Sequence, residues 1–288
     1  MISSYLMGGL GNQLFQICAS IALSMKFGTP FKFTYSTELT IGTIRPTYWD
    51  TFLSELKRYT AFGADIRKTN AIILNSFVVK ETSFEYSPIM LEPDCKTENY
   101  ILYGYYQSYR YFDEYFDKIC DIIKLQMKQE IVRDKCAALL DTPNYTVSMH
   151  FRIGDYKDVQ GCHNILSAKY YIAALKKICE QVETGKVRVI YFYEQKDVES
   201  VALTTAVLKR AFPNSEFIAV DHSLCDWEQM MLMSICDHNI IANSTYSWWG
   251  AYFNRNIRKR VVYPAQWFGP QLASKNTTDL FPKDWIKV

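Results

Sequence analysis

The residues with the clearest chemical potential lie in HFRIGDY, positions 150–156. They follow YTVSM (145–149), whose length and apolar character are typical of a buried strand. Because alternate side chains of a strand lie on the same face, His150 and Arg152 are expected to point the same way. Gly154 then allows a backbone turn, with Asp155 beyond it. The pattern predicts a site at the carboxyl end of a strand.

Each of these side chains has a chemical and a structural interpretation. Arg152 carries a permanent charge on a planar fork of donors that suits phosphate oxygens. His150 can donate to a phosphate or orient a substrate hydroxyl, and Asp155 can accept a proton as a general base. In the structural alternative, Arg152 forms a surface ion pair, His150 is a satisfied core histidine and Asp155 caps the turn. The sequence leaves both interpretations open.

A glycine loop, GGLGNQ (8–13), precedes a helical pattern. It is not a dinucleotide fingerprint, because Leu14 stands where the third glycine is needed, and it lacks the Lys-Ser/Thr ending of a P-loop. What remains is a loop with Gly9 and Gly11 at a helix N-terminus, where free N–H groups and the helix dipole favour an anion. The alternative is a simple tight turn.

A third segment, NSTYSWWGAYF (243–253), lies between a predicted strand and a predicted helix. Asn243, Ser244 and Thr245 are residue types that cap helices, and the same geometry presents hydroxyl and N–H groups to a phosphate. Trp248 and Trp249 either pack the helix on the sheet or stack on a ligand, and packing is favoured.

Alternating strands and helices position these segments from about residue 140 onward. Strands are predicted at 145–151, 187–193, 216–220, 238–243 and 260–264. Helices are predicted between them at 166–182, 197–212, 226–236 and 247–253. This βαβα order implies a parallel sheet with helices on both faces.

The first half of the chain reads as a looser α/β unit. Strands are predicted at 2–7, 30–35 and 100–107, a helix follows the glycine loop, and another helix covers 109–127. Residues 36–95 are irregular, and their aromatic and charged residues suggest a loop that faces a sugar: Arg45, Tyr48, Trp49 and Asp50. The sequence therefore predicts two α/β domains, 1–140 and 141–288, that face one cleft.

Composition excludes several classes of protein. The 288 residues are 49% hydrophobic with a net charge of +2, so they lack the basic field of a nucleic-acid-binding protein. The eight cysteines form no C-x-x-C pair, which argues against a zinc ribbon and favours a reducing compartment. No segment has the length of a transmembrane span or the pattern of a secretory leader. We expect a cytoplasmic protein, either free or peripheral to a membrane. The oligomeric state is not predicted.

Five segments occur in order along the chain: MGGLGNQLFQ, GYYQSYRYF (104–112), HFRIGDY, LSAKYY (166–171) and IIANSTYSWWGAYF (240–253). In this combination the chain resembles the α-1,2-fucosyltransferase family, inverting enzymes that transfer L-fucose from GDP-fucose to a galactose hydroxyl. The resemblance spans most of the chain and is weak over about 36–95 and the last 20 residues. It implies a GT-B-like fold, with acceptor bound by the amino-terminal domain and GDP-sugar by the Rossmann-like carboxyl-terminal domain.

The resemblance also implies roles for individual residues. Arg152 would hold the donor pyrophosphate with His150 beside it, and Asp221 or Glu228 would serve the guanosine. The full set of implied donor contacts is Gly9, Gly11, Asn12, Arg152, Asp221, Glu228, Asn243, Ser244 and Thr245. Many relatives carry two arginines in tandem, whereas Ile153 takes the second place here, which leaves one guanidinium for the phosphates.

The implied chemistry needs no cofactor or metal. The sequence contains no D-x-D motif, so Arg152, hydroxyl groups and helix N-termini would stabilise the GDP leaving group. Asp155 is the first candidate for the base that deprotonates the acceptor, a galactose-terminated glycan, and His150 is the second. Two alternatives stay open: a related transferase with another donor such as GDP-mannose or another linkage, and a non-catalytic carbohydrate-binding protein.

Overall fold

In the computed structural model, residues 1–40, 42–63, 65–91, 99–180, 182 and 186–288 are described. Their contacts divide the chain into two α/β units. The first comprises Met1–Gln126 with Lys275–Pro282, and the second comprises Met127–Ser274 with Lys283–Val288. The segment 275–282 therefore returns to the first unit, which the sequence did not predict.

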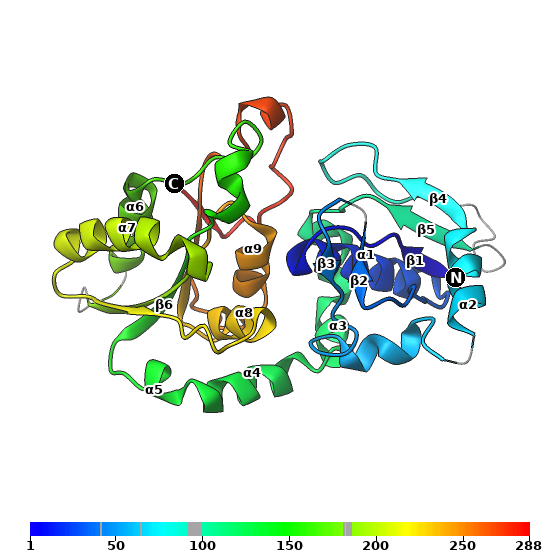
Figure 1. Cartoon of the computed structure of the whole chain (residues 1–288), viewed down its shortest axis with the longest axis horizontal. Helices are drawn as coiled ribbons and strands as arrows, with labels where there is room; N and C mark the ends of the chain where they lie inside the picture. The colour runs from blue at the N-terminus through cyan, green and yellow to red at the C-terminus, as the bar shows by residue number, and fades with distance from the viewer. Residues whose placement is uncertain (41, 64, 92–98, 181, 183–185) are drawn as a thin grey trace. The chain divides into compact units, whose positions relative to one another are not determined.

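The second unit contains a six-stranded sheet in the order β11-β10-β9-β6-β7-β8, with every pair parallel (Figure 1). The strands are β6 (Tyr145–His150), β7 (Val187–Phe192), β8 (Glu216–Ala219), β9 (His238–Ile240), β10 (Val261–Tyr263) and β11 (Ile286–Lys287). The predicted parallel sheet is confirmed. Only the two-residue β11 was missed, because so short a strand leaves no periodicity in the sequence.

Helices cover both faces of this sheet. Helices α6 (Ala168–Cys179) and α7 (Val198–Ala211) lie on one face. Helices α8 (Asp226–Ser234) and α9 (Thr245–Tyr252) pack against each other on the other side (Figure 1). Each predicted helix of this half is confirmed to within a few residues. In α6 the buried residues recur at helical spacing: Tyr171, Ala174, Leu175 and Ile178.

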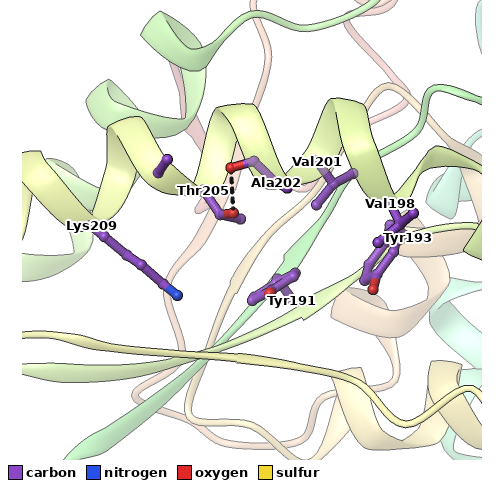
Figure 2. A pocket seen from close by; sticks show the side chains of 8 residues that line it. Tyr191, Tyr193, Val198, Val201, Ala202, Thr205 and Lys209 are labelled. Carbon is purple, nitrogen blue, oxygen red and sulfur yellow. Dashed lines mark hydrogen bonds between the residues drawn. The ribbon is translucent and has the colours of Figure 1, made fainter.

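A pocket of about 250 Å³ opens between α7 and β7 (Figure 2). Tyr191 and Tyr193 form its strand side, and helix residues complete it: Val198, Val201, Ala202, Thr205, Ala206 and Lys209. None of these lining residues is a carboxylate or an imidazole. The pocket thus provides no acid–base pair.

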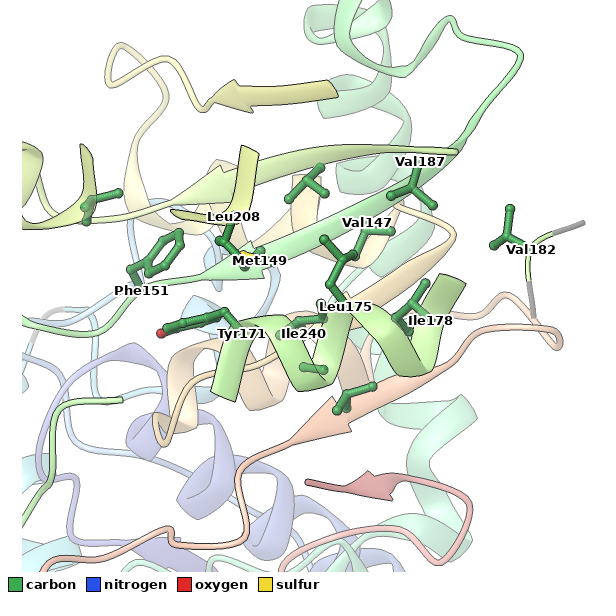
Figure 3. Packing of buried hydrophobic residues seen from close by; sticks show 14 of the residues in the cluster. Val147, Met149, Phe151, Tyr171, Leu175, Ile178, Val182, Val187, Leu208 and Ile240 are labelled. Carbon is green, nitrogen blue, oxygen red and sulfur yellow. The ribbon is translucent and has the colours of Figure 1, made fainter. Parts of the chain in front are cut away.

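Between the sheet and the α6 and α7 helices lies the main apolar cluster of the second unit (Figure 3). Val147 and Met149 from β6 meet Leu175 from α6 and Leu208 from α7, and each is fully buried. A buried aliphatic side chain of this size contributes about 1.5–3 kcal/mol relative to an exposed one. This cluster fixes β6 as a rigid central strand.

The first unit is built on three parallel strands in the order β1-β5-β4. Helix α1 (Leu10–Phe27) packs against β1 and ends at Gly28, which adopts a φ of 61° as a left-handed C-cap. The other elements of this unit are β1 (Ile2–Ser4), β2 (Glu38–Leu39), β3 (Arg45–Pro46), α2 (Ile66–Leu74), β4 (Phe77–Lys80), β5 (Tyr100–Tyr103) and α3 (Phe116–Ile122).

Two strand predictions for this unit are wrong in their extent. The segment 30–35 forms only isolated bridges at Phe31 and Phe33. The strand predicted over 100–107 ends at Tyr103, because Tyr106 adopts a φ of 50° that no strand tolerates. The Glu81 carboxylate accepts hydrogen bonds from the backbone N–H groups of Tyr105 and Tyr106 and so fixes this turn.

The helix predicted over 109–127 is also broken. Lys124, with a φ of 55°, separates α3 from α4 (Leu125–Lys135). Helix α4 then packs in the second unit, where Gln129 Nε2 donates to Ser234 Oγ at 2.9 Å. This contact explains why the division falls after residue 126, whereas the predicted boundary lies after 140 at the end of α5 (Ala137–Leu140).

The interpretation of Tyr48 and Trp49 as sugar-facing residues is wrong. Trp49 is 1% exposed and stacks on Phe33 with ring centroids 5.5 Å apart, and Tyr48 is also buried. Asp50 is exposed, and its carboxylate accepts from Lys57 and from the Tyr35 hydroxyl. The sequence shows aromatic residues in an irregular segment, but it does not show that the side chains of this segment are part of the hydrophobic core.

Candidate functional site

The carboxyl end of β6 presents side chains on two faces. Met149 and Phe151 belong to the apolar cluster, whereas the His150 ring lies 5.4 Å from the ring of Tyr246 on α9. The strand ends at His150, and the chain enters a 3-10 turn over Gly154–Asp158. The predicted strand and the turn at Gly154 are confirmed. Arg152 lies beyond the end of the strand, so its place on the same face as His150 stays a prediction.

Arg152 is held by two carboxylates. Its Nη1 donates to Glu194 Oε1, and its Nη2 donates to Asp155 Oδ1 at 2.5 Å. The guanidinium carbon also lies 5.1 Å from the ring centroid of Tyr156. The Arg152 side chain is 20% exposed, so the charge is shielded but reachable from solvent. The ion pair that sequence analysis raised as the structural alternative therefore exists, at the position expected for a phosphate ligand.

A buried carboxylate that sequence analysis missed fixes the turn. Asp197 is 2% exposed and accepts from the backbone N–H of Gly154 and from Lys157 Nζ, each at 2.7 Å. Gly154 has a φ of 31°, and a Cβ at this position would lie 2.7 Å from Glu194 Oε1. The positive φ favours glycine, and the Cβ of any other residue would also shift the flexible Glu194 carboxylate that Arg152 contacts. An acidic residue just before a predicted helix is too common to have signalled this role.

His150 is buried and electrically neutral. Burial, and then the nearby charge of Arg152, lower the pKa of His150 to about 3. Its Nδ1 has no hydrogen-bond partner among the residues that the structure describes. A group with so low a pKa is a weak base. The low pKa therefore argues against His150 as the proton acceptor.

The structure brings the segment 150–156 and the segment 243–253 together. The Tyr156 hydroxyl donates to the Asn243 carbonyl at 2.9 Å. The Asn243 side chain is buried, and its Nδ2 donates to the carbonyls of Asn164 at 2.9 Å and Trp267 at 3.2 Å. Asn243 thus ties loops together, while its Oδ1 is buried with no partner among the described residues.

Ser244 is the N-cap of α9. Its Oγ accepts from the backbone N–H of Tyr246 at 3.3 Å, as the sequence predicted for a capping residue. Thr245 is the first helical residue and is half-buried. The first turn of α9 holds no acidic residue, so the positive end of its dipole is uncompensated by a side chain of that turn.

The two tryptophans of α9 are structural. Trp248 and Trp249 are fully buried, Trp248 stacks on Tyr252 at 4.6 Å, and Trp249 lies 4.9 Å from Phe253 between ring centroids. The favoured interpretation, packing of the helix, is confirmed. These rings anchor α9 and thereby place Ser244 at the end of β9.

The two acids expected near a guanosine differ in their surroundings. Asp221 is exposed after β8, and its Oδ1 accepts from the N–H of Ser223 at 2.8 Å. Hydrogen bonds from Ser223 hold the pKa of Asp221 below its usual range. Glu228 is buried, where Oε2 accepts from the N–H of Cys225 at 2.9 Å and Oε1 pairs with Lys135 Nζ. Glu228 therefore caps α8 and joins it to α4.

The glycine loop belongs to the first unit. Gly9 is the N-cap of α1 and makes no side-chain cap, Gly11 is buried in the first turn, and Asn12 Oδ1 accepts from Gln107 Nε2 at 3.0 Å. Gln13 fastens the loop by donating to the carbonyls of Gly8 at 3.0 Å and Pro46 at 2.9 Å. The start of α1 thus has the uncompensated positive end that the sequence predicted.

Among the described residues, no group of three or more His, Cys, Asp or Glu side chains is placed to hold a metal ion. No helix within the same described part of the chain is both long and apolar enough to cross a membrane.

Comparisons with known proteins find relatives over the whole chain. A sequence model described as glycosyl transferase family 11 matches residues 3–288. The O-antigen biosynthesis glycosyltransferase WbnK of Escherichia coli is 28% identical over 322 aligned positions, which cover 99% of each chain. The alpha-1,2-colitosyltransferase of Escherichia coli is 25% identical over 303 positions, which cover 100% of this chain and 99% of its own.

Among solved structures, a variant of Arabidopsis thaliana FUT1 in complex with GDP superposes with a TM-score of 0.51 at 10% identity. The match covers 98% of this chain and 74% of that one. This likeness shows the fold, which is of the GT-B type, as the sequence predicted.

Proposed function

Because the chain belongs to glycosyltransferase family 11, we propose that it transfers L-fucose from GDP-fucose to the 2-hydroxyl of a terminal β-galactoside, with inversion and without a metal ion. The observation that carries the proposal is that the segment containing Arg152 meets the N-terminal segment of α9 beyond the carboxyl ends of β6 and β9, through Tyr156 to Asn243 and His150 to Tyr246. Ligands of open parallel sheets bind outside the carboxyl ends of the strands. A guanidinium and a helix N-terminus both complement a diphosphate.

The site's residues have distinct roles in this proposal. Negative charge grows on GDP as the bond from its phosphate oxygen to the sugar breaks. Arg152 and the first turn of α9, with Ser244 and Thr245, offset this charge. The acceptor hydroxyl attacks the opposite face of the sugar, and Asp155 takes its proton. Because the sequence contains no D-x-D motif, the positive groups of the chain itself carry the leaving-group stabilisation.

A second donor follows from the comparisons. A relative that is 25% identical over the whole chain is named an alpha-1,2-colitosyltransferase. Transfer of another GDP-linked sugar to the same hydroxyl is therefore the alternative. GDP-fucose, GDP-colitose and GDP-mannose at equal concentration separate these donors by their kcat/KM values.

Acceptor-dependent release of GDP tests the proposal. The assay uses GDP-fucose with and without lactose, in the presence of EDTA. We expect release that requires lactose, survives EDTA and falls at least 100-fold in Arg152→Ala, because the fork that meets the diphosphate is lost. Arg210→Ala, an exposed arginine on α7, is the matched control and should retain wild-type turnover. An Arg152→Ala protein with wild-type activity would remove Arg152 from the donor site.

A further inference from the structure

The turn that joins α9 to β10 holds a large aliphatic side chain in water. Ile257 is 99% exposed, compared with 75% for Leu203 on α7. A side chain that is fully exposed contributes no apolar burial to the fold. A partner with an apolar interior could bury it.

Hydrogen bonds within the turn fix the backbone on both sides of Ile257. Asn254 Oδ1 accepts from the N–H of Asn256, and Asn256 Oδ1 accepts from the N–H of Arg258, each at 2.9 Å. Asn254 is itself buried, and its Nδ2 donates to the carbonyl of Cys236 at 2.7 Å. Two successive Asx turns, anchored in the core, therefore hold Ile257 outward.

Lys259 supports the turn from inside. Its Nζ donates to the carbonyl of Ala251 at 3.2 Å, near the end of α9, and to the carbonyl of Asn254. Burial lowers the pKa of Lys259 to about 8, an effect that the charge of Asp284 opposes. Lys259 is therefore engaged within the fold rather than presented to a partner.

All the charged residues of the turn are basic. The segment 255–260 contains four cations and no acid, whereas the whole chain has a net charge of only +2: Arg255, Arg258, Lys259 and Arg260. Arg255 and Arg258 are exposed and flank Ile257 in the sequence. The Arg258 side chain makes no hydrogen bond or ion pair among the described residues. The turn thus presents an apolar tip between two exposed guanidinium groups.

We propose that this turn docks on an anionic lipid bilayer, with Ile257 in the apolar layer and Arg255 and Arg258 at the lipid phosphates. A bilayer buries a single protruding side chain without a matched pocket, and cations near an anionic surface strengthen binding. A protein partner typically needs a patch of about 800 Å², which the tip of one turn does not supply. A nucleic acid would meet the arginines but leave Ile257 in water.

The turn lies at the opposite edge of the sheet from the proposed donor site. The Arg260 carbonyl accepts from the N–H of Asn239 at 2.9 Å, at the amino ends of β9 and β10. Arg152 lies beyond the carboxyl end of β6, which runs parallel to β9. Docking through the turn therefore leaves the Arg152 segment uncovered, and it does not depend on which donor the site uses.

Sedimentation with lipid vesicles tests the docking. We expect the protein to bind vesicles of equal parts phosphatidylcholine and phosphatidylglycerol but not vesicles of phosphatidylcholine alone. Ile257→Ser should weaken binding about tenfold and Arg258→Ala about fivefold, because each removes one of the two contributions. Both residues are exposed, so both variants should melt within about 1 °C of wild type.

Two exposed residues of α7 provide matched controls: Leu203→Ser and Arg210→Ala should change vesicle binding less than twofold. Wild-type protein that ignores the mixed vesicles, or an Ile257→Ser protein that binds them as tightly as wild type, would overturn the proposal. Binding to double-stranded DNA that needs Arg258 but not Ile257, with no vesicle binding, would show that the partner is a nucleic acid. A larger loss in Leu203→Ser than in Ile257→Ser would place the membrane surface on α7 instead.

Discussion

Replacement of Asp197 by alanine tests how the turn that carries Asp155 is held. The Asp197 side chain is 1% exposed and accepts from the Gly154 N–H and from Lys157 Nζ, each at 2.7 Å. Asp197→Ala leaves the Gly154 donor without its partner, and loss of a hydrogen bond to a charged group costs about 1.5–3 kcal/mol. Lys157 is 47% exposed, so its ion pair adds only about 0.2–1 kcal/mol.

The total, about 2–4 kcal/mol, should appear as a lower melting temperature. For a unit of roughly 150 residues, each kcal/mol shifts Tm by about 2–4 °C, which gives a decrease of about 4–16 °C. Differential scanning fluorimetry measures this shift, and Asp158→Ala in the same turn is the control, expected to melt within about 1 °C of wild type. GDP release should also fall, since the turn positions Asp155.

Two results would refute this reasoning. An Asp197→Ala protein that melts within about 1 °C of wild type would show that the buried carboxylate does not hold the turn. A destabilised variant with wild-type kcat/KM would show that the turn does not position the reacting groups.

Two further variants probe the same strand end. Gly154→Ala should keep the fold but lower kcat/KM about tenfold. The new Cβ would lie 2.7 Å from Glu194 Oε1, so the Glu194 carboxylate would have to move and would hold Arg152 less firmly. Full activity in the GDP-release assay would contradict this close approach. The pKa of His150 is lowered to about 3 in the folded chain from about 6.5 when unfolded, so the unfolded state binds its proton first and stability is lost as pH falls from about 6.5 toward 3. Between pH 7 and pH 4, the free energy of unfolding of His150→Gln should therefore fall by up to about 3 kcal/mol less than that of wild type, as measured by urea unfolding. Equal decreases would show that His150 is not buried as a neutral group.

Sequence patterns were most informative where one period governed a whole element. The second unit follows the predicted βαβα order where one period is strong: β6 is an apolar run and α6 has one apolar face, as with Val147 and Met149 against Leu175. The HFRIGDY segment lies at a strand end, as predicted, because an apolar run followed by a glycine turn is compatible with few other structures.

The sequence was least informative where distant residues decide the geometry. Glu194 and Asp197 follow β7 and reach the segment 152–157 from 40 to 43 positions away, and no local pattern marks them. The positive φ angles at Tyr106 and Lys124, which end a predicted strand and break a predicted helix, depend on tertiary contacts such as those of Glu81. Burial of Trp49 likewise depends on Phe33, outside the segment that contains it.

In the proposed reaction, the chain joins fucose to O2 of a galactose in an α-1,2 linkage, with inversion. NMR of the product made from GDP-fucose and lactose tests it most directly, because the spectrum reports both the anomeric configuration and the acceptor oxygen. We predict a single α-L-fucosyl residue on O2 of the galactose. A β-linked product, a different acceptor oxygen, or no sugar transfer from GDP-fucose would contradict it.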